Sequence, residues 1–547
     1  MRMAENRKRS QLDTRQKNRL FYGSLVLLAL FVFMFVGSRE PVLFDDSDSY
    51  MLLQRAEGVM PLYPLFLFLN QYLFGLERYL DFVIVEQAVF AAVCTILFVR
   101  VIINKYSMRY WEGYFLFLLT LIPFTVELPQ AMMTQTILTE GLAYAAFYLL
   151  MLFFLRAVWE KRIRWVVVSY VVVFLLTMLR SQLQILFGVC GIVFLYVMWR
   201  GGNTKKKRLV RFMAGLAGCV LLSLFGIWIS ARTLAGYNDM IRNNLRFNAF
   251  AMKVQDPEYY DKLSTDENGA TREGETLEEA IRKDQEEETT ARRPVVTSQF
   301  TSLILSRGMY EADAEDRWLF EDEMVRGLYE TLYEAVDQEQ QRYSYEQKGL
   351  WMWKDIVGGI GQAGKTCLYA GVPYYQENYP EIYGGDEFNE VWNRSLQTIG
   401  IKLLQAHFAR FLYHTLMLLP QAFICTVFFQ IAPIYLLCHL VTLFLYLSAA
   451  ALMIWGYMDR KVSESSAEFM ALILGTNLVL VIVISLVFFG QQRYLIYAFG
   501  MFYIAYYVLL RKLWNLYLRG KIRQVWEGIR KDNGAQRGKV KAGKGSR

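Results

Sequence analysis

The chain has 547 residues, of which 54% are hydrophobic and 16% aromatic. Much of this apolar content lies in blocks of about 17 to 25 residues, the length that a helix needs to cross roughly 30 Å of hydrocarbon. Backbone amides inside that layer must be satisfied within the segment, so such blocks are expected to be helices. The composition therefore excludes an ordinary soluble protein and predicts an all-α integral membrane protein.

The formal net charge of +8 is unevenly distributed along the chain. Basic residues gather in the tails and short loops, whereas residues 250–345 are rich in Asp and Glu. Basic segments beside membrane spans set orientation and contact lipid headgroups, which predicts membrane lipids as partners and no nucleic acid. The six cysteines form no CxxC pair, and this argues against a disulfide framework or a zinc site.

About ten transmembrane helices are predicted. The first follows a basic leader, residues 1–19, and lacks a small-residue cleavage site, so it is expected to be a retained span rather than a signal peptide. The predicted spans are residues 20–38, 80–103, 111–127, 139–158, 163–179, 182–199, 212–230, 431–456, 466–489 and 495–511.

The clusters of lysine and arginine beside these spans fall on one side of a ten-span arrangement. They lie in the leader, in the loops after the fourth, sixth and eighth spans, and in the tail, residues 512–547. Because positively charged loops stay inside, a multi-pass protein of the cytoplasmic membrane with both termini cytoplasmic is predicted.

Two apolar stretches are not counted as spans. Residues 62–74 are too short and contain Pro64, and residues 411–430 contain Pro420 and run into the next block with almost no loop. Both are predicted to be juxtamembrane helices at the outer membrane surface.

The long segment between the two sets of spans is predicted to be external and mostly helical. Residues 276–288 and 322–342 are rich in helix formers with opposite charges four residues apart. The expected domains are the leader 1–19, an N-terminal transmembrane module 20–230 with an external catalytic loop 39–79, the external segment 231–410, a C-terminal part 411–511 with a juxtamembrane helix and the last spans, and the basic cytoplasmic tail 512–547.

Acidic residues gather just outside the first span, at Glu40, Asp45, Asp46 and Asp48. Carboxylates at a membrane face can act as a general base or hold a divalent metal through oxygen ligands. The same residues can form a solvated loop with an Asp or Ser cap before a short helix. The residues alone leave both interpretations open.

Short motifs follow one another in a distinctive order. They are Asp46-Ser-Asp-Ser-Tyr50, Pro61-Leu-Tyr-Pro64, Ile137-Leu-Thr-Glu140, Leu179-Arg180-Ser-Gln182 and Gln492-Arg493-Tyr494. In order and spacing, over residues 20–200 and 485–511, they resemble the GT-C superfamily of membrane glycosyltransferases, which includes protein O-mannosyltransferases and lipid A aminoarabinose transferases. The long external segment matches no known pattern.

The resemblance implies a GT-C-like fold and a glycosyltransferase of the cell envelope. The enzyme would move a sugar from a polyprenyl-phosphate donor to a glycan, lipid or protein acceptor. By the same resemblance, Asp46 would deprotonate the acceptor hydroxyl or help to hold a metal. Asp45 competes for this catalytic role, and Asp46 is favoured because it lies four residues before Tyr50. No cofactor is certain, and a divalent metal is the one that the site could hold.

A phosphate leaving group at the outer membrane boundary needs cationic partners, because its developing charge is poorly solvated there. Arg493 and Arg180 fall at external span ends, and the planar fork of arginine suits phosphate. Either could instead extend to the interface as a lipid-facing side chain, and Glu140 could serve as a helix-dipole partner. The predicted substrate-binding residues are Arg493, Arg180, Glu140, Asp48, Tyr50, Tyr494 and Gln182.

Residues 359–366 satisfy the phosphate-loop pattern G-x-x-x-x-G-K-[ST]. A nucleotide site needs a strand before the pattern and a helix after it, and the region lacks such alternation. A glycine-rich external turn is predicted instead. The three histidines, His407, His414 and His439, are not spaced as helical metal ligands and are expected to be structural.

Two other functional classes fit a multi-spanning chain. A transporter or flippase would favour helices broken in matching halves and ionisable residues near mid-membrane, whereas here these residues crowd the outer face. An O-antigen polymerase or ligase-like envelope glycan protein would rely on loop arginines rather than on an aspartate after the first span. The glycosyltransferase is the favoured interpretation.

Overall fold

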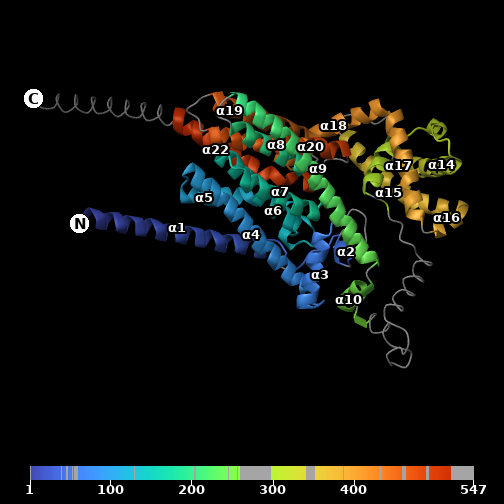
Figure 1. Ribbon diagram of the computed structural model, residues 1–547, viewed down its shortest axis with the longest axis horizontal. Coiled ribbons are helices and arrows are strands. Elements are labelled where there is room, and N and C mark those ends of the chain that lie inside the picture. Colours follow the sequence, from blue (N-terminus) through green and yellow to red (C-terminus); the bar gives the residue numbers. More distant parts are fainter. Residues whose placement is uncertain are drawn as a thin grey trace, which may run out of the picture.

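The computed structural model is a bundle of α-helices with a second group of helices beyond one end (Figure 1). No strand occurs in the part that it describes, where Val42 and Thr136 form an isolated bridge. The prediction of an all-α fold is therefore confirmed for these residues. The structure describes residues 2–38, 40–44, 47–51, 53, 59–128, 130–201, 205–243, 245–255, 257–258, 297, 299–339, 352–385, 387–429, 434–458, 464–487 and 492–518.

The helices of the first half are α1 (Arg2–Phe35), α2 (Ser47–Met51), α3 (Leu62–Phe74), α4 (Tyr79–Tyr106), α5 (Tyr110–Thr120), α6 (Glu140–Glu160), α7 (Ile163–Leu179), α8 (Leu186–Arg200), α9 (Lys205–Asn243) and α10 (Leu245–Gln255). The second half holds α13 (Gln299–Glu311), α14 (Glu323–Gln338), α15 (Met352–Asn378), α16 (Pro380–Gly384), α17 (Phe388–Ala406), α18 (Phe408–Val427), α19 (Tyr435–Met458), α20 (Glu464–Val487), α21 (Gln492–Leu495) and α22 (Phe499–Leu513). Shorter helical turns are η1 (Ile122–Thr125), η2 (Met133–Gln135), η3 (Ser181–Ile185), η4 (Ala314–Leu319), η6 (Ile496–Ala498) and η7 (Trp514–Leu518).

Among the described residues, eight helices are long and apolar enough to cross a membrane. They coincide with eight of the ten predicted spans, and α7 matches a ninth as an apolar helix of 17 residues. These helices are consistent with a membrane protein by length and composition.

The predicted span at residues 111–127 is wrong as a continuous helix. Helix α5 ends at Thr120, and the chain passes into η1, which contains Pro123. Proline lacks a backbone N–H and disfavours the helical conformation in the residue before it. The 11 residues of α5 extend over roughly 16 Å, about half of the hydrocarbon thickness.

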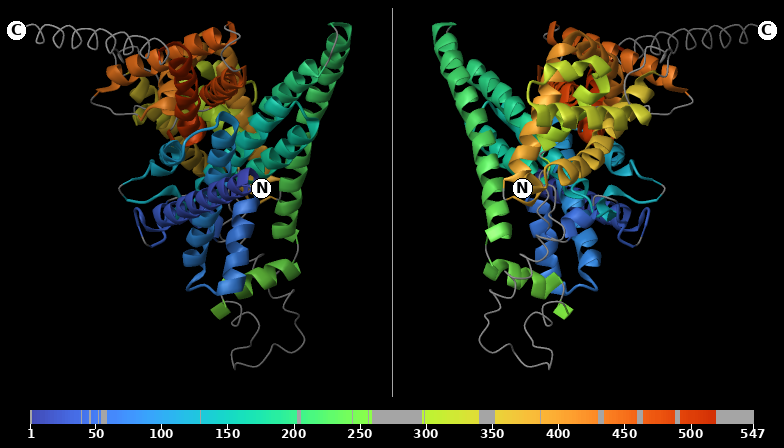
Figure 2. Two further views of the ribbon diagram at one scale, coloured as in Figure 1. Left: turned by 90° about the vertical axis from the view of Figure 1, so that its left-hand side faces the viewer. Right: turned by 90° about the vertical axis from the view of Figure 1, so that its right-hand side faces the viewer.

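Helix α9 crosses the expected domain boundary at residue 230 without a break. It has 39 residues, and no proline interrupts it after residue 230. It lies along the outside of the bundle in both views of Figure 2, where it packs against α8. The predicted helices at 62–74 and 411–430 are present as α3 and α18, with Pro420 inside α18. Their position at the outer membrane surface stays a prediction.

The helices α13 to α17 have a hydrophobic core of their own. Its centre holds the fully buried Trp392 and Tyr375. A Cβ on Gly308 would lie 2.9 Å from the Gly400 carbonyl oxygen, so the two glycines allow α13 and α17 to approach closely. Helix α14 begins where the sequence predicts it, with Asp322 capping its first N–H groups. The helix predicted at 276–288 lies outside the described residues.

The predicted turn at residues 359–366 is also wrong, because the whole segment lies inside α15. A Cβ on Gly364 would be 1.9 Å from the Ser306 hydroxyl. The glycine therefore serves close packing of α15 against α13. A continuous helix cannot form the phosphate-binding turn that the pattern describes, because its backbone N–H groups are already bonded along the helix.

Buried charged residues join this group of helices to α18. Glu311 Oε1 lies 2.6 Å from His414 Nδ1, and both side chains are buried. Arg307, also buried, donates to the Thr415 hydroxyl. Burial lowers the pKa of Arg307 to about 10, against the opposing effect of Glu311, so the guanidinium stays charged at neutral pH. His407 pairs likewise with a carboxylate, at 2.7 Å. The two histidines thus have structural partners.

We expect Glu311→Ala to destabilise the protein by about 3–5 kcal/mol, because it leaves the buried Arg307 without its nearby carboxylate. The thermal unfolding of detergent-purified protein, followed by circular dichroism, measures the effect. Glu315→Ala is the matched control, since Glu315 is exposed in the following turn. Equal melting temperatures for the two variants would show that the buried cluster does not stabilise the interface.

Candidate functional site

Three of the sequence-predicted residues meet at one point of the fold. The Glu140 carboxylate, at the start of α6, forms an ion pair with Arg180. Its Oε1 also lies 3.9 Å from Arg493 Nε. The Glu140 side chain is only 2% exposed, and that of Arg493 is 27% exposed. The carboxylate is therefore enclosed, while Arg493 reaches the surface.

A fourth sequence-predicted residue, Tyr494, completes this cluster with its aromatic ring. The guanidinium carbons of Arg180 and Arg493 lie 5.0 Å and 5.2 Å from the centre of the Tyr494 ring. Arg493 Nη2 also donates to the Tyr494 hydroxyl, at 3.2 Å. Cation–π contacts of this kind favour guanidinium groups that have lost part of their water. Glu140, Arg180, Arg493 and Tyr494 are hereafter called the arginine cluster.

Local backbone breaks place the two arginines. Helix α7 ends at Leu179, and Arg180 has the extended dihedrals φ −147° and ψ 119° before η3 begins. Arg493 lies in the four-residue helix α21, which leads through η6 into α22. Each arginine thus lies in a short segment beside a break between helices, where its side chain can turn towards the start of α6.

A buried glutamine holds the start of α6 in place. Gln87 of α4 donates through Nε2 to the carbonyl oxygens of Thr134 and Thr136, at 3.2 Å and 3.1 Å. Its Oε1 accepts from the Tyr63 hydroxyl at 3.3 Å. Because Gly141 packs directly against the Gln87 amide, α6 and α4 approach closely beside Glu140.

Two buried tyrosines support the cluster, and the sequence analysis missed both. The Tyr144 hydroxyl donates to the backbone carbonyl of Arg493 at 2.8 Å. The rings of Tyr144 and Tyr497 lie edge to face, with centroids 5.0 Å apart. Each tyrosine stands four residues after a cluster member, Glu140 or Arg493. That spacing, one helical turn, is the signal in the sequence that could have found them.

The other predicted residues lie elsewhere or outside the described residues, apart from Gln182, which lies near the cluster. Gln182, in η3, lies beside the Tyr497 hydroxyl. The Tyr50 ring packs edge to face on Tyr63, at 5.4 Å between centroids, and so reaches the Gln87 support rather than the arginine cluster. Asp48 belongs to α2. Asp45 and Asp46 lie outside the described residues.

The first loop is anchored to the segment that leads into α6. Val42 N–H donates to the Gln135 carbonyl oxygen at 2.9 Å, and its own carbonyl accepts from Ile137 N–H at 3.0 Å. The buried Ser47 hydroxyl donates to the Ile137 carbonyl oxygen at 2.9 Å. Described residues before and after Asp45 and Asp46 in sequence therefore contact a strand-like segment that ends three residues before Glu140.

The arrangement has chemical features that suit an anion. Arginine keeps its charge throughout the physiological pH range, and its fork of N–H groups matches phosphate or carboxylate oxygens. The buried Glu140 fixes the two guanidinium groups without filling the exposed side of Arg493. Among the described residues, no three His, Cys, Asp or Glu side chains are grouped as a metal site.

Comparison with known proteins found no relative of this chain. No protein-family model, curated protein or solved structure matches the chain.

We expect Gly141→Ala to destabilise the protein by about 1–3 kcal/mol through overpacking. The added Cβ would lie 2.3 Å from Gln87 Oε1 and 2.9 Å from the Met133 carbonyl oxygen. The Gln87 amide is held by three hydrogen bonds and cannot move aside without losing them. Thermal unfolding in detergent measures the loss.

Gly188→Ala is the control, because nothing lies within 4 Å of a Cβ at that position in α8. This variant should melt at or slightly above the temperature of the unmodified protein, because alanine favours a helix over glycine. If Gly141→Ala melts like Gly188→Ala, then α6 is not packed against Gln87 in the way described.

Proposed function

We propose that this protein is a membrane glycosyltransferase that transfers a sugar from a polyprenyl-phosphate-linked donor to an acceptor at the outer face of the cytoplasmic membrane. One observation carries the proposal. Residues selected from the GT-C resemblance, in three distant parts of the chain, gather around the buried Glu140. The acceptor would be a glycan, a lipid or a protein.

The arginine cluster supplies the chemistry that a phosphate leaving group needs. As the bond between the sugar C1 and the phosphate oxygen breaks, its electron pair passes to the phosphate. Arg493, with Arg180 behind it, would stabilise that negative charge in surroundings where water is scarce. Glu140 would hold both guanidinium groups in position before the donor binds.

The acceptor side of the reaction is assigned to the first loop. In the proposed step the acceptor oxygen bonds to C1, and its proton passes to the Asp46 carboxylate, with Asp45 as the alternative base. The hydrogen bonds of Val42 and Ser47 to the segment before Glu140 support a role for this loop at the same site. As an alternative to taking the proton, these aspartates would hold a divalent metal at the reaction centre.

The charge pattern supports an outer location for the site. Glu140 begins α6, whereas the basic residues Lys161 and Arg162 follow the end of that helix. The 21 residues of α6 extend over about 30 Å, the thickness of the hydrocarbon layer. Since basic loops stay in the cytoplasm, the arginine cluster is assigned to the opposite face, with both termini inside.

The same placement argues against a transporter or flippase, in which ionisable residues lie near mid-membrane. A polymerase or ligase-like envelope glycan protein would also use arginines at this face. It would not need an aspartate in the first loop, so variants of that loop separate the two functions.

We expect Asp46→Asn to lower sugar transfer by at least about 100-fold, as loss of a general base does. Arg493→Gln should lower it by about 100- to 1000-fold, because it removes a donor to the developing phosphate charge. The assay measures radiolabel transferred in isolated membranes from a panel of undecaprenyl-phosphate sugars carrying hexoses or pentoses. Asp45→Asn, made separately, shows which aspartate is the base.

Asp81→Asn is the matched control, since Asp81 is exposed in the first turn of α4, near the same end of the bundle. It should transfer sugar at the unmodified rate. If both first-loop variants also transfer at that rate, the mechanism is wrong. If unmodified membranes transfer no sugar of the panel, the proposed activity fails.

A further inference from the structure

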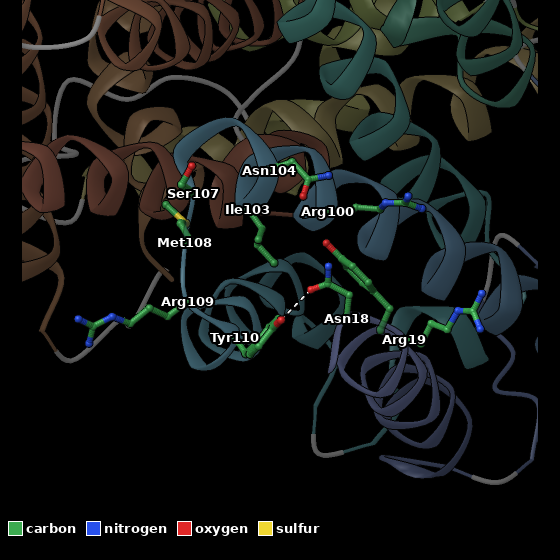
Figure 3. A pocket seen from close by; sticks show the side chains of 10 residues that line it. Asn18, Arg19, Arg100, Ile103, Asn104, Ser107, Met108, Arg109 and Tyr110 are labelled. Carbon is green, nitrogen blue, oxygen red and sulfur yellow. Dashed lines mark hydrogen bonds between the residues drawn. The ribbon is translucent and has the colours of Figure 1, made fainter. Parts of the chain in front are cut away.

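A second polar site lies at the other end of the bundle. A cleft of about 1070 Å³ opens between α1, the end of α4 and the start of α5. Ten described residues line it; three are arginines, Arg19, Arg100 and Arg109, and none is acidic. Figure 3 shows Arg19 and Arg100 on the same side of this cleft, with Arg109 directed away from them.

The cleft also presents neutral hydrogen-bond donors. The Tyr110 hydroxyl donates to Asn18 Oδ1 at 2.7 Å, which fixes the amide and leaves its NH₂ group as a donor (Figure 3). Asn104 lies on the wall of the cleft beside Arg100. The Arg100 guanidinium carbon lies 5.4 Å from the centre of the Tyr22 ring, so this side chain is held by a contact that leaves its N–H groups available.

Several arginines elsewhere in the protein are neutralised by a carboxylate. Arg180, Arg200, Arg410 and Arg511 each pair with a carboxylate. None of the three cleft arginines forms an ion pair with any carboxylate of the described residues. Arg19 and Arg100, on one side of a cleft whose lining holds no acidic residue, favour an anionic ligand.

An apolar groove continues from the same cleft. A second hollow of about 380 Å³ shares Arg100 and Asn104 with it and extends between α4 and α6. Leu97, Val101 and Phe153 are among the apolar residues of its wall. The combined shape therefore suits an amphipathic ligand, with a negatively charged head on the arginines and a hydrocarbon chain in the groove.

The position of the cleft, at one end of the helix bundle, favours a ligand from the lipid headgroup layer. Tyr106, at the end of α4, packs edge to face on Trp159, at the end of α6. The cleft thus lies at the opposite end of α6 from Glu140, about 30 Å away along the helix. This is the end from which the basic loops emerge, where anionic headgroups collect.

We propose that this cleft binds an anionic phospholipid of the surrounding bilayer. The lipid phosphate contacts Arg100 and Arg19, the amide of Asn18 donates to a headgroup oxygen, and one acyl chain lies in the groove between α4 and α6. Basic pockets between membrane helices bind acidic lipid heads in this way. The site is separate from the arginine cluster and does not rest on the proposed glycosyltransferase activity.

The test measures the melting temperature of delipidated protein in a neutral detergent, titrated with phosphatidylglycerol or with phosphatidylcholine of the same chains. Since a ligand of the folded state raises the melting temperature, phosphatidylglycerol should stabilise the protein and phosphatidylcholine should not. Arg100→Gln should raise the half-maximal phosphatidylglycerol concentration about tenfold, as expected for loss of one charge-assisted hydrogen bond. Arg19→Gln provides an independent variant should Arg100→Gln not fold.

Arg162→Gln is the matched control, because Arg162 is an exposed arginine at the same end of α6 but outside both hollows. Its response to phosphatidylglycerol should equal that of the unmodified protein. Equal stabilisation by the two lipids would contradict the proposed site. So would an equal rise of the half-maximal phosphatidylglycerol concentration in Arg162→Gln and Arg100→Gln, because it would show that unspecific surface charge attracts the lipid. Equal stabilisation by inorganic phosphate would overturn the lipid as its ligand.

Discussion

The ion pairs of Glu140 are the interaction on which the rest of the proposed site depends. A carboxylate that is 2% exposed loses most of its hydration, and that loss is recovered only when cations and donors are held at the right place. Arg180 and Arg493 supply the cations, and Gln87, Gly141 and Tyr144 fix the backbone around them. The start of α6 is thereby tied to the end of α7 and to the entry of α22. A site assembled from three helix ends is rigid before any ligand arrives, which is what stabilisation of a transition-state charge requires.

The two ends of the bundle use arginine in different ways. At one end, the arginines pair with a buried carboxylate and pack against tyrosines. Their side chains are therefore fixed in position, and part of their positive charge is balanced. At the other end, Arg19 and Arg100 face a cleft without an acidic residue in its lining. The first arrangement suits chemistry at a defined atom, and the second suits a mobile bilayer lipid. Helix α6 connects the two, and its closely packed, largely buried middle carries no Asp, Glu, Lys, Arg or His between Glu140 and Arg156.

Much of the helical framework could be predicted from apolar block length, because a membrane-spanning helix must satisfy its own backbone. The failures have specific causes. Hydropathy alone extends a helix to residue 127, but Pro123 ends it earlier. Gly364 lies in a phosphate-loop sequence pattern, but in the structure it allows two helices to pack closely. The sequence predicted that Glu140, Arg180 and Arg493 belong to one site, but it did not predict that they form ion pairs. Gln87 and Tyr63 could not be found, since their roles come from contacts across helices that carry no local spacing signal.

A double-mutant cycle between Glu140 and Arg180 tests the central claim most directly. Glu140→Gln and Arg180→Gln, alone and together, would be compared by chemical unfolding in mixed micelles. Glu140→Gln removes the carboxylate that the mostly buried Arg180 pairs with, and Arg180→Gln leaves Glu140 with only the more distant Arg493. Each should cost about 3–5 kcal/mol, whereas the double variant should cost much less than the sum. Strict additivity of the two single effects would show that the carboxylate and the guanidinium do not interact, and the arrangement on which the site is built would be wrong.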